Sequence, residues 1–198
     1  MEKDMAPYYY NAFEQGVDQK LRKQLQNTIM ESEANADDIV VLCIGTDRAT
    51  GDCLGPLVGE HLKHVLPEIR VYGTLENPVH ALNLEETVHA LYKEHANPYI
   101  IAIDASLGVP EHIGYITLSQ TPLMPGKGVN KKLPAIGHLS ITGIVNVAGF
   151  PNSILLQSTR LHTVMTLADC ISSAICQYFT ATYDSIEQDT TLYLSALQ

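Results

Sequence analysis

Compact apolar runs alternate with segments of helical periodicity through the middle of this chain, and this alternation limits the folds that it can adopt. DIVVLCIG (38–45), RVYGTL (70–75) and PYIIAIDASLG (98–108) are rich in Val and Ile, as buried parallel strands are. Between them, residues 54–65 and 83–95 carry apolar side chains at helical spacing. The order strand, helix, strand, helix, strand predicts a three-layer α/β/α fold with a central, mainly parallel, doubly wound sheet.

The flanking sequence predicts the remaining elements. An apolar residue recurs every four positions from about Asn11 to Ser32, which predicts an amphipathic helix followed by a polar hinge. We therefore expect an N-terminal helix and hinge (1–37) packed on a single α/β/α domain (38–198) that ends in a C-terminal tail. GYITLSQ (114–120) and NSILLQS (152–158) are predicted strands, separated by a long loop, and the last confident helical pattern begins soon after the second of them.

Charge and composition exclude several classes of function. A formal net charge of −10 on 198 residues argues against nonspecific binding to nucleic acid or to an anionic membrane. The first residues lack the basic start and apolar run of a secretory signal, and no apolar stretch approaches the roughly 18 residues of a transmembrane helix. The protein is expected to be cytoplasmic. Its four cysteines show no CxxC or zinc-finger spacing, and Cys43, Cys170 and Cys176 are expected to be buried.

The segment CIGTDRATGDCLGPLVG (43–59) is longer than a plain turn between a strand and a helix needs to be. It places Asp52 at the start of a predicted helix, and Asp104 ends the third predicted strand. If the strand order begins 2-1-3, the loop after the first strand and the end of the third face the same crevice at the carboxyl edge of the sheet. Either acid alone suits a structural capping role. Together, at one edge of the sheet, the two acids indicate a site for hydrolysis or metal binding.

A close pair of carboxyl groups permits two kinds of chemistry. Mutual repulsion raises one pKa, so one carboxyl holds a proton while the other activates water, as amide hydrolysis requires. The pair can instead bind a divalent metal ion, which would want a third ligand, and His138 in AIGHLSITG, before a Ser/Thr-rich turn, is the candidate. Cys53 is a nucleophile candidate, but Asp52 beside it opposes thiolate formation and burial is the better interpretation. Common phosphate-binding motifs are absent from the sequence.

The motifs CIGTDRATGDCLGPLVG, AIDASLG, PLMPGKGVNKKLP and SITGIVN, in this order, resemble the sporulation protein YyaC family of spore-forming bacteria. The resemblance covers about Asp38 to Phe179. That family is similar to the germination protease, which degrades small acid-soluble spore proteins, and more distantly to the hydrogenase maturation endopeptidases. Both relatives have an α/β/α fold with a mainly parallel sheet, which implies the same fold here and a peptidase-like domain.

The resemblance also implies roles for individual residues. The catalytic acids of the germination protease match Asp52 in GDCLGP and Asp104 in IDASLG, and its PGSGVGNKR-like loop resembles PGKGVNKK, which contains Lys127. In the hydrogenase maturation enzymes, two acids and a downstream His bind nickel. Asp52 and Asp104 match these acids too, and His138 is the nearest match for the His.

From these observations we predict a spore peptidase that hydrolyses peptide bonds with Asp52 and Asp104, acts on a peptide or spore protein, and lies in the cytoplasm of the forespore or spore. It requires no cofactor on this reading, and the sequence leaves the oligomeric state open, a homo-oligomer included. The alternatives are a nickel- or zinc-binding protein and a non-catalytic sporulation factor that binds a peptide or protein partner. The expected substrate-binding residues are Thr46, Asp47, Gly51, Gly55, Lys127 and His138.

Overall fold

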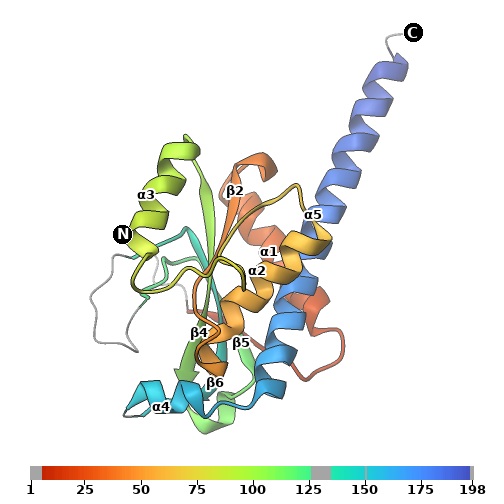
Figure 1. Cartoon of the computed structure of the whole chain (residues 1–198). Coiled ribbons are helices and arrows are strands. Elements are labelled where there is room, and N and C mark those ends of the chain that lie inside the picture. Colours follow the sequence, from red (N-terminus) through yellow and green to blue (C-terminus); the bar gives the residue numbers. More distant parts are fainter. Residues whose placement is uncertain (1–5, 126–134, 150, 197–198) are drawn as a thin grey trace.

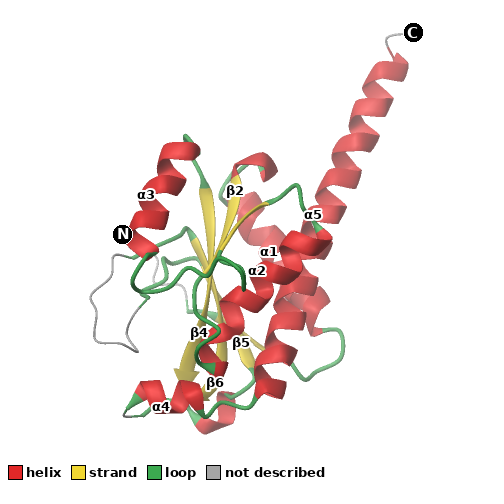
Figure 2. Cartoon of the chain, viewed as in Figure 1, coloured by secondary structure: helices red, strands yellow, loops and turns green. Residues whose placement is uncertain are grey.

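The computed structural model describes residues 6–125, 135–149 and 151–196. Figure 1 shows a sheet with helices on both of its faces, and Figure 2 distinguishes the helices from the strands. The strands are β1 (Tyr8–Asn11), β2 (Ile39–Cys43), β3 (Arg70–Tyr72), β4 (Tyr99–Gly108), β5 (Tyr115–Ser119) and β6 (Leu139–Val147). The α-helices are α1 (Val17–Glu31), α2 (Leu54–Val65), α3 (Leu84–Glu94), α4 (Asn152–Gln157) and α5 (Leu161–Ala196). Short 3-10 helices are η1 (Ala36–Asp38), η2 (Thr50–Cys53) and η3 (Pro110–His112).

The six strands form one sheet in the order β1-β5-β6-β4-β2-β3. Strands β3, β2, β4 and β6 are parallel neighbours, whereas β5 runs antiparallel to both β6 and β1. The predicted mainly parallel α/β/α fold is confirmed. So is the 2-1-3 start of the strand order, since β2 lies between β3 and β4.

Two apolar cores lie on opposite faces of the sheet because successive strand residues point to opposite sides. Helices α1, α2 and α5 cover one face, where Val41 and Ile103 contribute to the larger core. Helix α3 covers the other face, where Val40, Leu42 and Ile100 contribute to the smaller core. Every residue of β2 is buried, as the continuous apolar run predicted for a strand covered on both faces.

The N-terminal region contributes to this sheet as well as to its helical cover. Strand β1, which the sequence analysis did not predict, pairs antiparallel with β5. The predicted helix begins at Val17 rather than near Asn11, because residues before it belong to this strand and a turn. Helix α1 lies against α5, and its Asp18 carboxylate accepts hydrogen bonds from Ser173 and Gln177 of that helix.

The predictions for the last third of the chain need three corrections. The segment after His138, predicted to be a Ser/Thr-rich turn, is β6, which lies between β4 and β5. The predicted strand NSILLQS is helix α4, because a short apolar run is compatible with either element. The expected C-terminal tail continues α5 as far as Ala196, and its end projects beyond the body of the molecule in Figure 1.

Within the described parts of the chain, none of the helices combines the length and the apolar character needed to cross a membrane.

Candidate active site

The loop after β2 returns closely to the strand that it leaves, and two glycines allow it to do so. Gly45 has a positive φ of 143°, and a Cβ there would collide with the backbone carbonyl oxygen of Asp52. A Cβ at Gly55 would collide with the carbonyl oxygen of Ile44, so helix α2 packs directly on the end of β2. The Thr46 N–H donates to the Asp52 carbonyl oxygen at 2.9 Å. Asp52 is thereby fixed at the carboxyl end of β2.

Strand β4 places the second acid beside this loop. Asp104 lies in register with Thr142 of β6, on the face of the sheet that α3 covers, because it shares parity with Ile100. The strand runs on to Gly108 instead of ending at Asp104, with a register shift between Ser106 and Leu107. Such irregularities commonly re-aim side chains near functional sites.

Both acids line one cavity of about 330 Å³. Its walls come from the loop after β2, from η2, from β4 and β6, from the segment before α3 with the start of that helix, from the segment that follows β5, and from α4. Most lining residues are apolar, and they include Ile44, Leu84, Leu107, Leu123 and Leu156. The polar side chains are those of Asp52, His80, Asp104, Ser106, Thr142 and Asn152. A mostly apolar cavity with a few convergent polar groups is typical of a small-molecule or peptide site.

The cavity perturbs the two acids to different extents. Burial and the charge of Asp52 raise the pKa of Asp104 well above its usual range, although the Ala105 N–H donates to Asp104 Oδ1 at 2.8 Å. Burial also raises the pKa of Asp52, but the Thr46 backbone and His80 act in the opposite direction. The pair therefore favours one proton, held by Asp104, and one negative charge, held by Asp52.

Hydroxyl groups form a chain of hydrogen bonds along the wall next to Asp104. Thr142 Oγ1 lies 2.7 Å from Thr117 Oγ1 and 3.1 Å from Ser106 Oγ. Because Thr142 is the neighbour of Asp104 across the β4–β6 pairing, this chain fixes the side chain beside the acid. The sequence analysis missed Thr142 and Ser106, because it interpreted the segment containing Thr142 as a turn.

His138 lies outside this cavity, which corrects the expectation that it is near the acids. Its Nδ1 accepts a hydrogen bond from the Ile100 N–H at 3.0 Å, and its ring stacks on that of Tyr99 at 5.1 Å. Ile100 precedes Asp104 by four residues on β4, or about 13 Å of strand. His138 is thus at the opposite edge of the sheet, where it caps the start of β4.

Among the described residues, His80 is the histidine that lines the cavity, and the sequence analysis did not single it out. The described residues contain no cluster of three or more His, Cys, Asp or Glu side chains placed to hold a metal ion. The donor set expected for a nickel site, two carboxylates and His138, does not assemble in this structure.

Apart from Lys127, the other expected substrate-binding residues lie in the loop after β2 or at the start of α2, and their role in substrate binding stays a prediction. Thr46 holds the loop and Asp47 is exposed on it. Gly51 and Gly55 are buried packing positions: a Cβ at Gly51 would lie 2.7 Å from Thr159 Oγ1, so this glycine allows η2 to pack against the end of α4. Lys127 lies outside the described residues.

Three of the four cysteines, Cys43, Cys53 and Cys170, are buried, whereas Cys176, also expected to be buried, is only partly so. Cys53 is 8% exposed, and its Sγ lies 2.9 Å from the Thr50 carbonyl oxygen. Burial and the charges of Asp52 and Asp47 raise the pKa of Cys53, which opposes thiolate formation as expected. Cys43 and Cys170 are buried in the larger core, and Cys176 packs against it.

Comparison with known proteins adds three findings. A family described as "Protein of unknown function (DUF1256)" matches residues 9–174. The "Uncharacterized protein YyaC" of Bacillus subtilis (strain 168) is 47% identical over 162 residues, which cover 80% of this chain and 79% of the relative. The solved structure of the [NiFe] hydrogenase maturation protease HycI from Thermococcus kodakarensis matches with a TM-score of 0.53 and 16% identity, covering 79% of this chain and 99% of that one. The structural match shows a common fold.

Proposed function

The chain belongs to the family described as a protein of unknown function (DUF1256) and is a homologue of YyaC, and we propose that it is a spore peptidase that hydrolyses a peptide bond with Asp52 and Asp104. The sequence motifs resemble those of the YyaC family, and the 47% identity to YyaC confirms this relationship. The observation that carries the proposal is the placement of two acids with raised pKa values in one largely apolar cavity.

The unequal environments of the acids suggest their roles. The Asp52 carboxylate accepts a proton from a water molecule, whose oxygen then attacks the carbonyl carbon of the scissile bond. The protonated Asp104 donates to the carbonyl oxygen as charge develops there. Collapse of the tetrahedral intermediate breaks the C–N bond, and the amine leaves with the proton that Asp52 accepted. A hydroxyl group of the intermediate returns a proton to Asp104, so both acids regain their starting protonation states. The apolar walls exclude competing water from around the reacting groups.

The substrate and the location of the protein form part of the same proposal. The similarity of the YyaC family to the germination protease suggests peptides from spore proteins as substrates, cleaved in the cytoplasm of the forespore or spore. The fold shared with a hydrogenase maturation protease is compatible with peptide hydrolysis, because that protein is itself described as a protease. A library of fluorogenic peptides together with small acid-soluble spore proteins is the substrate set to screen.

Substitution of each acid tests the proposal. Asp52→Asn and Asp104→Asn preserve size and shape, and each is expected to lower kcat by about 10²–10⁴-fold because it removes a proton-transfer group. Asp37→Asn, which changes an exposed acid that does not line the cavity, is the control and should retain activity. Full cleavage by both cavity variants, measured by mass spectrometry of the products, would falsify the assignment.

A titration with Ni²⁺ and Zn²⁺ separates hydrolysis by side chains from metal binding. On our proposal, cleavage continues in a chelator and metal affinity is low. Tight binding that the Asp52→Asn variant loses would favour the metal-binding alternative instead. Peptide binding without cleavage of any library member would favour a non-catalytic sporulation factor.

A further inference from the structure

The acid cavity contains a third titratable side chain, that of His80. Asp52, His80 and Asp104 are the three titratable residues among the described residues that line the cavity. The charge of His80 acts to lower the pKa of Asp52. The pKa of Asp104 depends instead on burial and the charge of Asp52, which raise it, and on the Ala105 N–H, which lowers it. The pair is therefore asymmetric.

The backbone explains this asymmetry. Residues Gly45 and Thr46, which follow β2, hydrogen-bond on two sides. The Gly45 N–H donates to the carbonyl oxygen of Val79 at 2.8 Å, and the Thr46 N–H donates to the carbonyl oxygen of Asp52 at 2.9 Å. His80, which follows Val79, and Asp52 are thus both held next to the consecutive residues Gly45 and Thr46. Asp104, by contrast, belongs to the neighbouring strand β4.

A short turn before α3 fixes the position of His80. The His80 N–H donates to Asn83 Oδ1 at 2.8 Å, and the His80 carbonyl oxygen accepts from the N–H groups of Asn83 and Leu84 at 3.0 and 2.9 Å. Asn83 Nδ2 donates in turn to the Pro78 carbonyl oxygen at 3.0 Å. A side chain on so constrained a backbone loses little freedom when it contacts a partner.

The ring itself has one nitrogen occupied. The Leu82 N–H donates to His80 Nδ1 at 3.4 Å, so Nδ1 acts as an acceptor. In a neutral imidazole the other nitrogen then carries the proton. His80 accordingly offers an Nε2–H donor and no second acceptor.

We propose that His80 is a positioning residue of the acid pair: its imidazole holds the negative charge of the pair on Asp52, and so leaves the shared proton on Asp104. The inference rests on the proposed function, which it deepens by naming the side chain that keeps the base on Asp52 and the acid on Asp104. An Nε2–H group next to a carboxylate stabilises the ionised form, which is the state that the general base requires.

Charged groups on the far side of His80 also bear on this role. His80 lines a second, more polar cavity of about 460 Å³ as well, which contains Lys63 and Glu76. These two side chains carry opposite charges, and Asp52 and Asp104 face His80 from the acid cavity. Any titration must therefore compare variants of His80 with variants of Lys63 and Glu76 at the same ionic strength.

A direct titration of the acids tests the proposal without a substrate. The carboxyl carbons of ¹³C-labelled aspartate are followed by NMR, and Asp52→Asn and Asp104→Asn identify the two signals. In the wild type the Asp52 signal titrates at the lower pH. In His80→Ala we expect the Asp52 midpoint to move upward, toward that of Asp104. An unchanged Asp52 midpoint would overturn the proposal, even if the wild-type protein cleaves no peptide.

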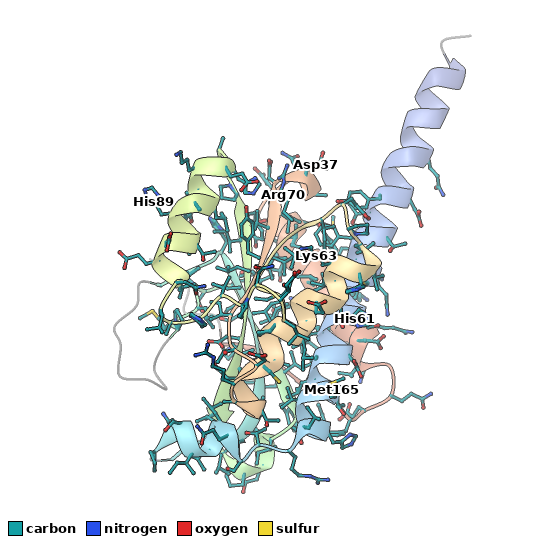
Figure 3. All side chains as sticks on the ribbon, in the orientation of Figure 1. Asp37, His61, Lys63, Arg70, His89 and Met165 are labelled. Atoms are coloured by element: carbon teal, nitrogen blue, oxygen red, sulfur yellow. The ribbon has the colours of Figure 1, made fainter. Side chains whose placement is uncertain are left out.

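Kinetics supply the second readout where a cleaved peptide has been found. His80→Ala is expected to lower kcat by about 10- to 100-fold at little cost in KM, as is typical when a residue that orients a reactive group is removed. His80→Gln keeps an N–H donor and should recover part of the loss. His89→Ala is the matched control, because His89 is exposed on the outer side of α3 (Figure 3). Equal kcat in His80→Ala and wild type would contradict the assignment while leaving the aspartate proposal intact.

Discussion

Asp52 and Asp104 reach the same cavity by different structural means. Asp52 depends on a loop that closes back on β2, which the absence of a side chain at Gly45 permits. Asp104 is part of the continuous strand β4, and its Oδ1 accepts from the next N–H along the chain. Both side chains remain partly exposed to the cavity, so solvent and substrate can reach them. The free-energy cost of burying these carboxyl groups consequently depends on whether they are protonated, and therefore on pH.

The raised pKa of Asp104 makes the free energy of unfolding depend on pH in a defined direction. The folded chain holds the Asp104 proton at pH values where the unfolded chain, with a carboxyl pKa near 3.9, has lost it. The contribution of Asp104 to stability is therefore fully present below about pH 4 and is lost as the pH rises through the folded-state pKa.

Asp104→Asn should consequently stabilise the protein at neutral pH. The amide keeps an oxygen that accepts from the Ala105 N–H but carries no charge to bury. We expect Tm to rise by a few degrees at pH 7, since about 1 kcal/mol corresponds to roughly 2–4 °C for a chain of this size. The gain should vanish near pH 3.5. Thermal unfolding followed by circular dichroism checks this, with Asp47→Asn, at an exposed position, as the control. Equal Tm values for Asp104→Asn and the wild type at both pH values would contradict the prediction.

Single residues also show where sequence reasoning succeeded and failed. The sequence placed Asp52 in the loop after one strand and Asp104 at the end of another, and such positions meet at one edge of the sheet in this class of fold, although β4 in fact runs on past Asp104. The positions of the histidines in the sequence do not indicate in the same way which part of the fold they face. His80 and His138 both follow loops, and only the paths of the chain before α3 and before β6 decide which of them faces the acids.

At the scale of elements, the contact between α2 and the end of β2 determines where the loop acid lies. Gly55 is in the first turn of α2, and a Cβ there would collide with the carbonyl oxygen of Ile44. Neither atom is the far end of a flexible side chain, so the helix as a whole must move to make room. Asp52 directly precedes this turn and would move with it.

Gly55→Ala is therefore expected to destabilise the protein and to disturb the cavity. Crowding of this kind typically costs about 1–3 kcal/mol, which denaturant unfolding measures as a lower midpoint at constant slope. Gly149→Ala is the matched control, because its Cβ would lie 3.3 Å from a terminal carbon of the flexible Leu155 side chain. A Gly55→Ala variant as stable as the control would show that α2 adjusts without strain.

The elements that sequence reasoning missed have a common cause. Strand β6 contains Ser140, Gly143 and Asn146, which favour turns in isolation, yet it is a central strand. The tertiary context overrides that tendency, because the hydroxyl group of Thr142 is satisfied by Thr117 and Ser106. Helix α4 shows the reverse error, since a short apolar run does not distinguish a strand from a helix.

At the scale of the whole molecule, the order of the strands brings the proposed chemistry together. Strands β2 and β4 are adjacent in the sheet although β3 and α3 lie between them in the sequence. Their carboxyl ends form one edge, and both the segment before α3 and helix α4 close over it. The alternation of strands and helices was sufficient to predict this edge. The closing segments were not predictable, because their positions depend on loops whose sequences have no periodicity.

Helix α5 connects this body to a projecting C-terminal end. Its first part is buried in the larger core, where Phe179 is 1% and Tyr178 5% exposed. Tyr183 still packs against that core, and Asp184 and Ser185 are exposed. Beyond these residues the helix extends away from the sheet in Figure 1. The core and the candidate site should therefore not depend on the last turns of the helix.

Truncation within α5 tests this division of the helix. A chain that ends at Ser185 should keep its Tm within about 3 °C of the full-length value, since it retains every buried side chain of the helix named above. Phe179→Ala in the full-length chain should instead cost about 3–5 kcal/mol, because it leaves a cavity beneath the sheet. Differential scanning calorimetry of both variants at one protein concentration gives the comparison. If the truncated chain loses as much stability as Phe179→Ala, the projecting turns contribute to folding, for example through a second copy of the chain, and repeating the scan at several concentrations would detect that contribution.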